Sequence, residues 1–161
     1  MIFFTVGTEK FAFDRIIQAA DLVACALPKE EVFIQIADNV RAPHTARWER
    51  WLTYEEFSQR LDHARVVVTH AGAGTLLSCV KRGKVAISIP RRSERGEHVD
   101  NHQVEFAQKM AELGHTIVGN SPEELCHLVV NYELEVAKIC QRSVYQPTLA
   151  NTLKRWLAEG A

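Results

Sequence analysis

The sequence lacks the features that mark secreted proteins, membrane-spanning proteins and proteins with cysteine-based metal sites. No uninterrupted apolar run approaches the roughly 20 residues that a membrane helix requires, and the apolar start at residues 1–6 is too short for the core of a secretion signal. The four cysteines are widely spaced and form no Cys-x-x-Cys pair, which excludes the common zinc and dithiol motifs. We therefore expect a soluble, cytoplasmic protein whose thiols are isolated and buried.

An excess of charge of one sign is missing as well. The sequence contains nineteen Lys and Arg residues and twenty Asp and Glu residues, which gives a net charge of -1. Such a chain cannot neutralise many phosphates of a nucleic-acid backbone, so nucleic acid is not an expected partner. Hydrophobic residues make up 47% and charged residues 24%, as in ordinary globular proteins, and 161 residues are the length of one domain.

What the sequence does contain is an alternation of strand-like and helix-like segments. Short, β-branched and mostly apolar segments, typical of strands covered on both faces, occupy residues 2–6, 32–37, 66–69, 85–89 and 116–118. Helical periodicity occupies residues 13–27, 53–64, 75–82 and 101–113, a segment that begins at 121, and residues 148–158. This alternation predicts one Rossmann-like α/β domain, residues 1–161, with a mainly parallel sheet.

Several predicted helices carry signals at their ends. Thr53 to Glu56 and Ser121 to Glu124 have the form of capping boxes, the second with Pro122 at the first helical position. Gly83 and Gly114 directly follow two predicted helices, and glycine readily adopts the left-handed backbone conformation that ends a helix. The last predicted helix, at about 148–158, carries Leu149, Leu153, Trp156 and Leu157 on one side and is expected to dock. Residues 38–50 are the least periodic stretch.

Ligands of parallel α/β sheets bind at the carboxyl ends of the strands, so the loops after the strands are the candidate sites. Gly7 and Thr8 follow the first strand and could offer backbone N–H groups to an anion, although a plain structural turn explains them equally well. His70 to Thr75, a small-residue loop that leads into a helix, is a stronger candidate for a diphosphate site. It lacks the third glycine of the dinucleotide fingerprint and the lysine of a Walker loop.

The most polar loop follows the strand at 85–89. Eleven of the fourteen residues from Pro90 to Gln103 are polar or charged. Carboxylate, amide and imidazole groups together suit the hydroxyls of a sugar. Alternatively, His98 and His102, with Asp100 between them, are metal ligands at i, i+4 spacing, or the loop is simply solvated. We expect the arginines of this loop, Arg91, Arg92 and Arg95, to be solvated.

Several short motifs follow one another over residues 2 to about 118. They are Val6-Gly7-Thr8 with Phe13-Asp14-Arg15, Thr69-His70-Ala71-Gly72-Ala73-Gly74-Thr75, Gly83-Lys84, Ile89-Pro90-Arg91 and Gly96-Glu97-His98-Val99-Asp100-Asn101-His102-Gln103. This combination resembles the glycosyltransferase family 28 C-terminal domain. The likeness is greatest to its stand-alone branch, the donor-binding subunits of two-part transferases in exopolysaccharide synthesis and the dolichol pathway. The implied fold is the C-terminal half of a GT-B glycosyltransferase.

The resemblance also implies roles for individual residues. The donor diphosphate is assigned to His70, Gly72, Ala73, Gly74 and Thr75. Uracil is assigned to the stretch Trp51-Leu52-Thr53, and the ribose to Ser78. The sugar is assigned to Glu97, His98, Asp100 and Gln103, and the mouth of the site to Gly7 and Thr8. Many family members have a carboxylate three residues after the threonine, where this chain has Ser78, which offers the ribose only a neutral hydrogen bond.

The implied function is that of a UDP-sugar-binding subunit in a two-component, inverting glycosyltransferase that needs no metal or other cofactor. A membrane-associated partner subunit would hold the lipid-linked sugar acceptor, supply the general base and recruit this chain to the inner face of the membrane. The alternative is a non-catalytic nucleotide-sugar-binding or enhancer subunit. The polar loop favours the transferase, because a pure scaffold has no need for Glu97, Asp100 and Gln103 beside a phosphate site.

Overall fold

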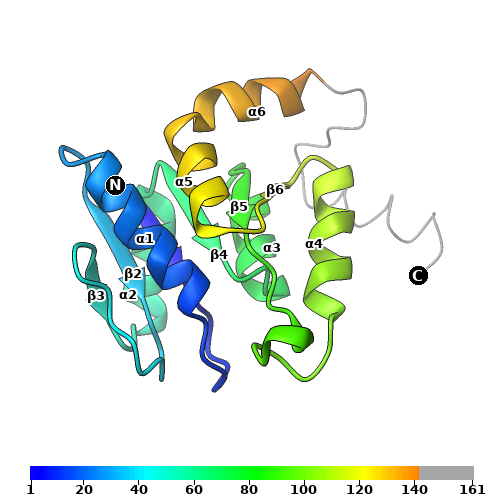
Figure 1. Cartoon of the computed structure of the whole chain (residues 1–161). Helices are drawn as coiled ribbons and strands as arrows, with labels where there is room; N and C mark the ends of the chain where they lie inside the picture. The colour runs from blue at the N-terminus through cyan, green and yellow to red at the C-terminus, as the bar shows by residue number, and fades with distance from the viewer. Residues whose placement is uncertain (142–161) are drawn as a thin grey trace.

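Six parallel strands form one sheet with helices on both faces, in a computed structural model that describes residues 1–141 (Figure 1). The strands are β1 (Ile2–Thr5), β2 (Val32–Gln35), β3 (Arg47–Glu49), β4 (Val66–Thr69), β5 (Ala86–Ser88) and β6 (Thr116–Val118). Their order is β3-β2-β1-β4-β5-β6, and every neighbouring pair is parallel. This is the strand order of the Rossmann fold, so the predicted fold class is confirmed.

The helices connect and cover these strands. They are α1 (Asp14–Ala26), α2 (Tyr54–His63), α3 (Ala73–Lys81), α4 (His102–Glu112), α5 (Pro122–Val130) and α6 (Tyr132–Cys140), with a 3-10 turn, η1 (Ser93–Arg95), in the polar loop. Strand β3 and helix α6 were not predicted. The predicted docking helix at 148–158 lies outside the residues that the structure describes.

Two separate apolar layers hold the helices to the sheet. Side chains of a strand alternate between its faces, so Ile2 and Phe4 of β1 pack in the layer under α1 and α5, whereas Phe3 packs in the layer under α2, α3 and α4. All three are fully buried. Every strand except β3 thus contributes to both cores, which explains why these strands have continuous apolar sequences.

The helix ends follow the predicted signals, with one difference. Thr53 and Glu56 form both hydrogen bonds of a capping box. Ser121 accepts a hydrogen bond from the backbone N–H of Glu124, but the Glu124 carboxylate accepts from Asn120 N, so the second box is only half formed. Gly83 and Gly114 have φ values of 67° and 80°, as a left-handed stop requires.

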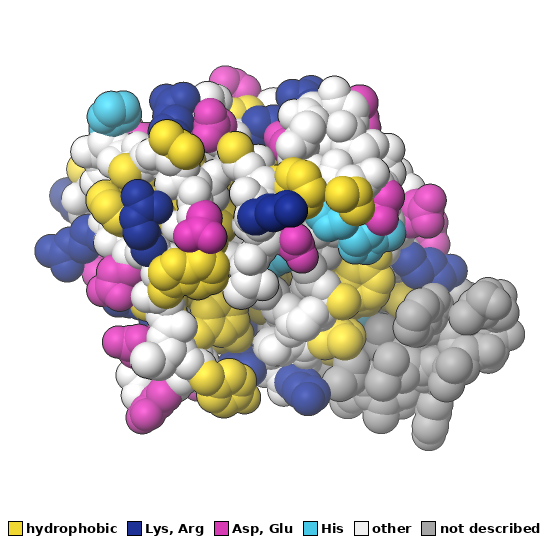
Figure 2. All heavy atoms as spheres, turned by 90° about the horizontal axis from the view of Figure 1, so that it is seen from below, with side chains coloured by type: hydrophobic (Ala, Val, Ile, Leu, Met, Phe, Trp, Pro, Cys, Tyr) yellow, Lys and Arg dark blue, Asp and Glu magenta, His cyan; other side chains and the backbone are white. Residues whose placement is uncertain are grey.

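The strand order creates a crevice at the carboxyl ends of the central strands β1 and β4. The chain leaves β1 toward β2 on one side, while β4 continues the sheet on the other side. Loops that follow β1 and β4 therefore part at their carboxyl ends, where ligands of this fold class bind. Figure 2 looks onto the molecule from below Figure 1, and on this face histidine side chains lie next to hydrophobic ones.

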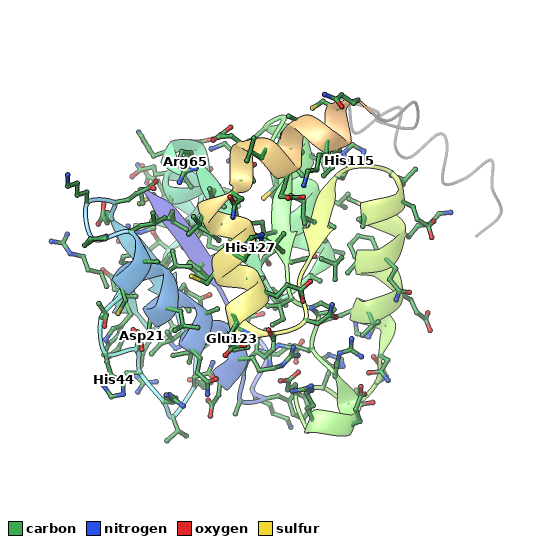
Figure 3. All side chains as sticks on the ribbon, turned by 45° about the horizontal axis from the view of Figure 1, so that its top comes forward. Asp21, His44, Arg65, His115, Glu123 and His127 are labelled. Atoms are coloured by element: carbon green, nitrogen blue, oxygen red, sulfur yellow. The ribbon has the colours of Figure 1, made fainter. Side chains whose placement is uncertain are left out.

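The unpredicted strand β3 is held by side chains rather than by its own apolar pattern. All three of its residues are exposed. The Asp21 carboxylate on α1 accepts hydrogen bonds from the backbone N–H groups of His44, Thr45 and Ala46, which fixes the segment that enters β3 (Figure 3). Because this anchor comes from another element, no local periodicity reveals it.

The cysteines are only partly as expected. All four are free thiols, but Cys25 and Cys140 are exposed, so the expectation of burial was wrong for these two. Cys79 is buried, and burial raises the pKa of its thiol to about 12. Within residues 1–141, no helix has the length and apolar character needed to cross a bilayer.

Candidate functional site

A cleft of about 490 Å³ opens at the carboxyl ends of β1 and β4. Ten of the predicted site residues line it: Gly7, Thr8, Trp51, Leu52, Thr53, His70, Gly72, Gly74, Thr75 and Ser78. Sequence reasoning missed the remaining lining residues, Thr5, Gln35, Tyr54, Phe57, Ser58, Leu61 and Arg82. The structure thus brings the residues assigned to diphosphate, uracil, ribose and site mouth together in one place.

The first turn of α3 faces this cleft without a side-chain cap. The helix begins at Ala73, two residues earlier than predicted, and its N-cap residue Gly72 has no side chain that could satisfy the first N–H groups. Helices α2 and α5 have such caps from Thr53 and Ser121, whereas α1, α4 and α6 lack one, as α3 does; α3 is the helix whose first turn lies at the cleft. The first N–H groups of a helix have no partner within the helix and carry its positive dipole end. This turn is therefore able to bind a phosphate.

His70 fills the space between the two glycine loops. A Cβ atom on Gly7 would lie 2.4 Å from His70 Cε1, and one on Gly72 would lie 2.2 Å from His70 Nε2. Both positions therefore need glycine. Burial, reinforced by the positive charge of Arg91, lowers the pKa of His70 to about 4, so the ring is neutral at pH 7. Ala71, the next residue, has a left-handed φ of 67° that non-glycine residues rarely adopt.

Two buried polar side chains hold the loop after β1. Thr5 Oγ1 accepts a hydrogen bond from Gly7 N at 3.1 Å and donates one to Gln35 Oε1 at 2.7 Å. The Gln35 amide donates to the carbonyls of Gly7 and Arg50, both at 3.1 Å. The sequence held one signal for these two residues, because each is a polar residue at the end of an apolar strand. Buried polar groups are nearly always hydrogen-bonded.

The outer walls of the cleft, α2 and α3, are tied together by Arg82. Its guanidinium donates to the Ser78 carbonyl at 3.1 Å, to Ser58 Oγ at 2.7 Å and to the Asp62 carboxylate at 2.6 Å. The Ser78 hydroxyl donates to the Gly74 carbonyl at 2.7 Å and keeps its lone pairs as acceptors. Trp51 is 49% exposed at the rim, which leaves its ring available for stacking.

The polar loop after β5 is anchored by a buried arginine, Arg91, for which the expectation of a solvated side chain was wrong, whereas Arg95 is exposed as expected and Arg92 is half-buried. Arg91 is fully buried. Its guanidinium donates to the carbonyls of Val6, Phe11 and Glu97 and stacks over the Phe13 ring, 4.5 Å from its centre. Burial lowers the pKa of Arg91 to about 10. Arg91 thus ties the polar loop to both ends of the loop that carries Gly7.

Glu97 and Gln103 also make contacts within the protein. The Glu97 carboxylate accepts two hydrogen bonds from the Arg15 guanidinium, at 2.7 and 2.5 Å, and a third from Arg92 N at 3.0 Å. Gln103 is 5% exposed, and its Oε1 accepts from Arg91 N at 3.3 Å. Neither residue lines the cleft, and neither do Ala73, His98 and Asp100. The predicted sugar-binding role of the polar loop stays a prediction.

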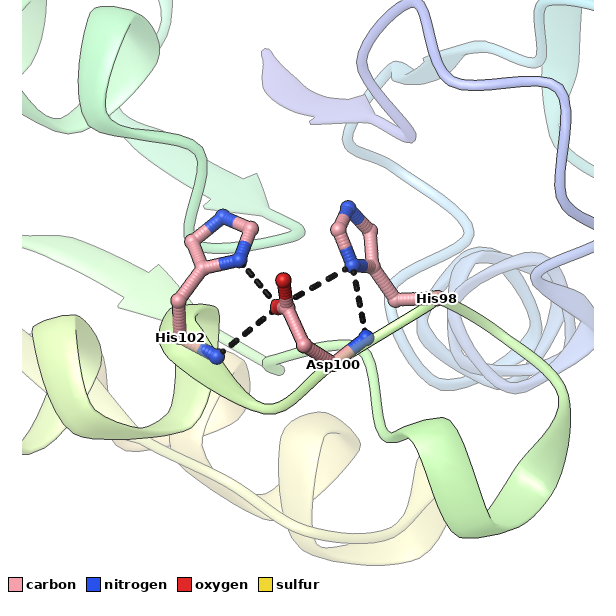
Figure 4. A group of neighbouring side chains, drawn as sticks. All are labelled: His98, Asp100 and His102. Atoms are coloured by element: carbon pink, nitrogen blue, oxygen red, sulfur yellow. Dashed lines mark hydrogen bonds and ion pairs between the residues drawn. The ribbon is translucent and has the colours of Figure 1, made fainter.

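His98, Asp100 and His102 form a separate cluster (Figure 4). Asp100 Oδ1 lies 3.3 Å from His98 Nδ1, accepts a hydrogen bond from His102 N at 3.1 Å, and also contacts His102 Nδ1. These hydrogen bonds from His102, backbone first, lower the pKa of Asp100. Asp100 and His102 are exposed, whereas the His98 side chain is 9% exposed.

Taken together, the site offers an uncapped helix start for an anion, an aromatic rim, and a neighbouring polar loop held by the buried Arg15–Glu97 ion pair and by Arg91. An anion at the start of α3 would meet backbone N–H groups and the Thr75 hydroxyl, because the guanidinium of Arg82, which also lines the cleft, is already bound to Ser58, Asp62 and the Ser78 carbonyl. This arrangement suits a ligand that combines a flat ring with phosphates.

Comparison with known proteins agrees with this geometry. A curated relative, the human protein "UDP-N-acetylglucosamine transferase subunit ALG13", is 25% identical over 130 residues, which are 71% of this chain but 10% of that protein. This chain therefore spans only a small part of that relative's length.

Solved structures extend the fold comparison. The glycosyltransferase of kitacinnamycin has a TM-score of 0.61 at 18% identity and is matched over 99% of this chain and 40% of its own length. MurG of Acinetobacter baumannii has a TM-score of 0.57 at 18% identity, over 89% of this chain and 45% of its own. These neighbours are GT-B glycosyltransferases, and the match covers their C-terminal half. A model of one family matches residues 1–146, and the chain belongs to that family, the glycosyltransferase family 28 C-terminal domain.

Proposed function

We propose that this chain is the UDP-sugar-binding subunit of a two-component glycosyltransferase. The observation that carries the proposal is the uncapped first turn of α3, which faces a cleft at the point where the sheet reverses its strand order. Family membership supports it, because it makes glycosyl transfer the chemistry to which this cleft belongs. The printed name of the human relative, a transferase subunit, supports a multi-part enzyme.

The donor lies along the cleft in the proposed complex. The N–H groups of Ala73 to Thr75 and the Thr75 hydroxyl bind the diphosphate, and Trp51 and Leu52 meet uracil between α2 and α3, with Ser78 near the ribose. The leaving diphosphate is stabilised by these N–H groups and the helix dipole, in the manner of other preorganised anion sites, and not by a divalent metal.

The sugar lies toward the polar loop. Asp100 is exposed, and Gln103 follows it on the first turn of α4. The family resemblance makes these two residues the proposed contacts with sugar hydroxyls, although the Gln103 side chain is buried and its Oε1 accepts a hydrogen bond from Arg91 N. Glu97 and His98 support that loop from behind. The acceptor hydroxyl displaces the diphosphate directly and inverts the anomeric carbon, with the general base supplied by the partner.

The second half of the enzyme is proposed to be a separate, membrane-associated subunit. This chain matches only 40–45% of the length of the two solved transferases described above, and a displacement reaction needs a second surface to hold the acceptor in line. The partner binds a lipid-linked sugar acceptor and recruits this cytoplasmic chain to the inner face of the membrane. The proposed setting is exopolysaccharide synthesis.

Calorimetry with UDP, UMP and ADP in the presence of EDTA tests donor binding. UDP should bind best, because it alone combines uracil with the diphosphate that α3 receives. UMP should lose the diphosphate contacts, and ADP the contacts with uracil. Equal weak binding of all three nucleotides, or binding of UDP only after Mg²⁺ is added, would contradict the proposed site.

A further inference from the structure

The cluster of His98, Asp100 and His102 has a chemistry that donor binding does not explain. It lies next to the cleft but outside its lining, and one ligand atom from each side chain falls within 4.8 Å of the other two. Two imidazoles and a carboxylate are a common ligand set of transition metals. The sequence showed the two histidines at i, i+4 spacing, and the structure adds Asp100 as a third ligand.

His98 Nδ1 and Asp100 Oδ1 lie close together in this cluster. His98 Nδ1 accepts a hydrogen bond from Asp100 N at 3.3 Å, which uses the one lone pair of that nitrogen. The same nitrogen lies 3.3 Å from Asp100 Oδ1. A proton or a metal ion placed between the two atoms would be attracted by both, and it would replace the hydrogen bond from Asp100 N. In a tetrahedral site with bonds of about 2.0–2.1 Å, neighbouring ligand atoms stand about 3.3 Å apart.

We propose that His98 Nδ1, Asp100 and His102 bind one borderline divalent transition-metal ion, with Zn²⁺ as the representative. The nitrogen ligands favour Zn²⁺, Ni²⁺ and Cu²⁺ over Mg²⁺ and Ca²⁺, which prefer oxygen. His98 provides the rigid ligand, because its side chain is 9% exposed and its ring packs 5.8 Å from that of Phe11. His102 is 60% exposed, so the ion enters from solvent and keeps a position for water.

A consequence follows that rests on the proposed function. Asp100 is the proposed contact with a sugar hydroxyl, and a carboxylate bound to a metal ion is not free to make that contact. The ion should therefore weaken binding of a UDP-sugar and leave binding of UDP unchanged, since the diphosphate site at α3 does not include the cluster. Transition-metal binding would then regulate sugar recognition without taking part in transfer.

The first experiment titrates Zn²⁺ into the full chain without nucleotide. Because exposed thiols also bind Zn²⁺, the background carries Cys25→Ser and Cys140→Ser, the two exposed cysteines. One ion should bind per chain, and His102→Ala or Asp100→Asn should weaken binding at least tenfold. His63→Ala, which removes an exposed histidine on α2, is the matched control and should change nothing. Circular dichroism checks that each variant is folded.

Co²⁺ absorption identifies the ligands in the same proteins. A visible d–d spectrum that is lost in His102→Ala and kept in His63→Ala supports the site. Zn²⁺ affinity that is equal in the parent, His102→Ala and Asp100→Asn proteins overturns it, because the cluster then holds a proton and not a metal. A second titration, of UDP and of a UDP-sugar with and without Zn²⁺, tests the consequence. If Zn²⁺ binds but no UDP-sugar binds even without it, the proposed function fails and the metal site stands.

Discussion

Gly72 and Gly74 stand two residues apart in the loop after β4, yet they are glycines for different reasons. A Cβ atom on Gly72 would collide with the His70 ring, whereas one on Gly74 would meet nothing within 4 Å. Gly74 lines the cleft, so the empty space beside it is the space that we assign to the diphosphate. Steric effects on folding and on binding can therefore be separated within one turn.

Gly74→Val should weaken UDP binding at least tenfold while the fold stays intact, because the new side chain occupies the phosphate space and Val is no worse than Gly in a helix. Gly72→Ala should instead lower the free energy of unfolding by about 1–3 kcal/mol, the usual cost of overpacking. Calorimetry with UDP and urea unfolding measure the two effects. Loss of stability in Gly74→Val equal to that in Gly72→Ala would contradict this division.

His70 should make the stability of the fold depend on pH. Its pKa is about 4 in the folded chain, lowered by burial and then by Arg91, against about 6.5 when unfolded. Between these values only the unfolded chain takes up the proton, so the free energy of unfolding is highest above pH 6.5 and falls by up to about 3 kcal/mol as the pH drops to 4. Urea unfolding of the parent at pH 7 and pH 5 measures this loss.

His70→Asn is the variant that isolates this contribution. It removes the titrating ring, so its stability should fall less between pH 7 and pH 5 than that of the parent, whatever its stability at pH 7. His63→Ala serves as the control, since His63 is exposed. A pH dependence that is the same in the parent and in His70→Asn would show that other groups cause it.

At the scale of elements, the loop between β5 and α4 is held by charged side chains that are buried in the protein. Arg15 on α1 meets Glu97, and Arg91 meets the carbonyls of the loop after β1. The two candidate halves of the site, the loop with Gly7 and the polar loop, are thereby fastened to each other. Their relative position does not depend on a bound donor to set it.

Glu97→Gln should therefore destabilise the fold by about 3–5 kcal/mol, because Arg15 is left buried without its carboxylate. Asp100→Ala should change stability by less than about 0.5 kcal/mol, as an exposed residue does, and should spare UDP while weakening a UDP-sugar. Urea unfolding and calorimetry compare the two. The double variant Arg15→Met with Glu97→Leu should regain most of the lost stability. A stable Glu97→Gln protein that has lost only UDP-sugar binding would make Glu97 a sugar contact.

The predicted and the missed elements differ in where the residues that stabilise them lie, within the element itself or in a distant part of the chain. Four of the predicted strands have buried apolar residues of their own, and the fifth, β6, has two half-buried ones, so their apolar pattern predicted all five. Strand β3 is exposed and depends on Asp21 from α1, so its own residues hold little signal. The same holds in the site: the glycine loop is a local motif, whereas the burial of Arg91 and Glu97 depends on residues more than 70 positions away. Polar residues that are buried by distant partners look like solvated ones in a sequence.

At the scale of the whole molecule, alternation of strands and helices predicted the fold class, and one rule about strand ends predicted where the cleft lies. The order of the strands was not predictable from periodicity, because nothing local states which strand lies beside β1. That order positions the candidate site, since it places the loops of Gly7 and of Gly72 on either side of one crevice. In the proposed function, this crevice binds the donor and a second surface holds the acceptor.

The isolated chain should therefore show no more than trace transfer of sugar to a lipid-linked acceptor, because the described domain offers one cleft and no second domain to align an acceptor with the anomeric carbon. Mixed with a membrane-associated partner subunit, it should become active and move to the membrane fraction. The assay uses a panel of UDP-sugars with lipid-linked glucose or N-acetylglucosamine, with and without the partner. Gly74→Val is the matched control: it should still reach the membrane with the partner but transfer no sugar. Robust transfer by this chain alone would refute the two-subunit enzyme, and a reconstituted pair that transfers none of the sugars would leave a non-catalytic nucleotide-sugar-binding subunit as the function.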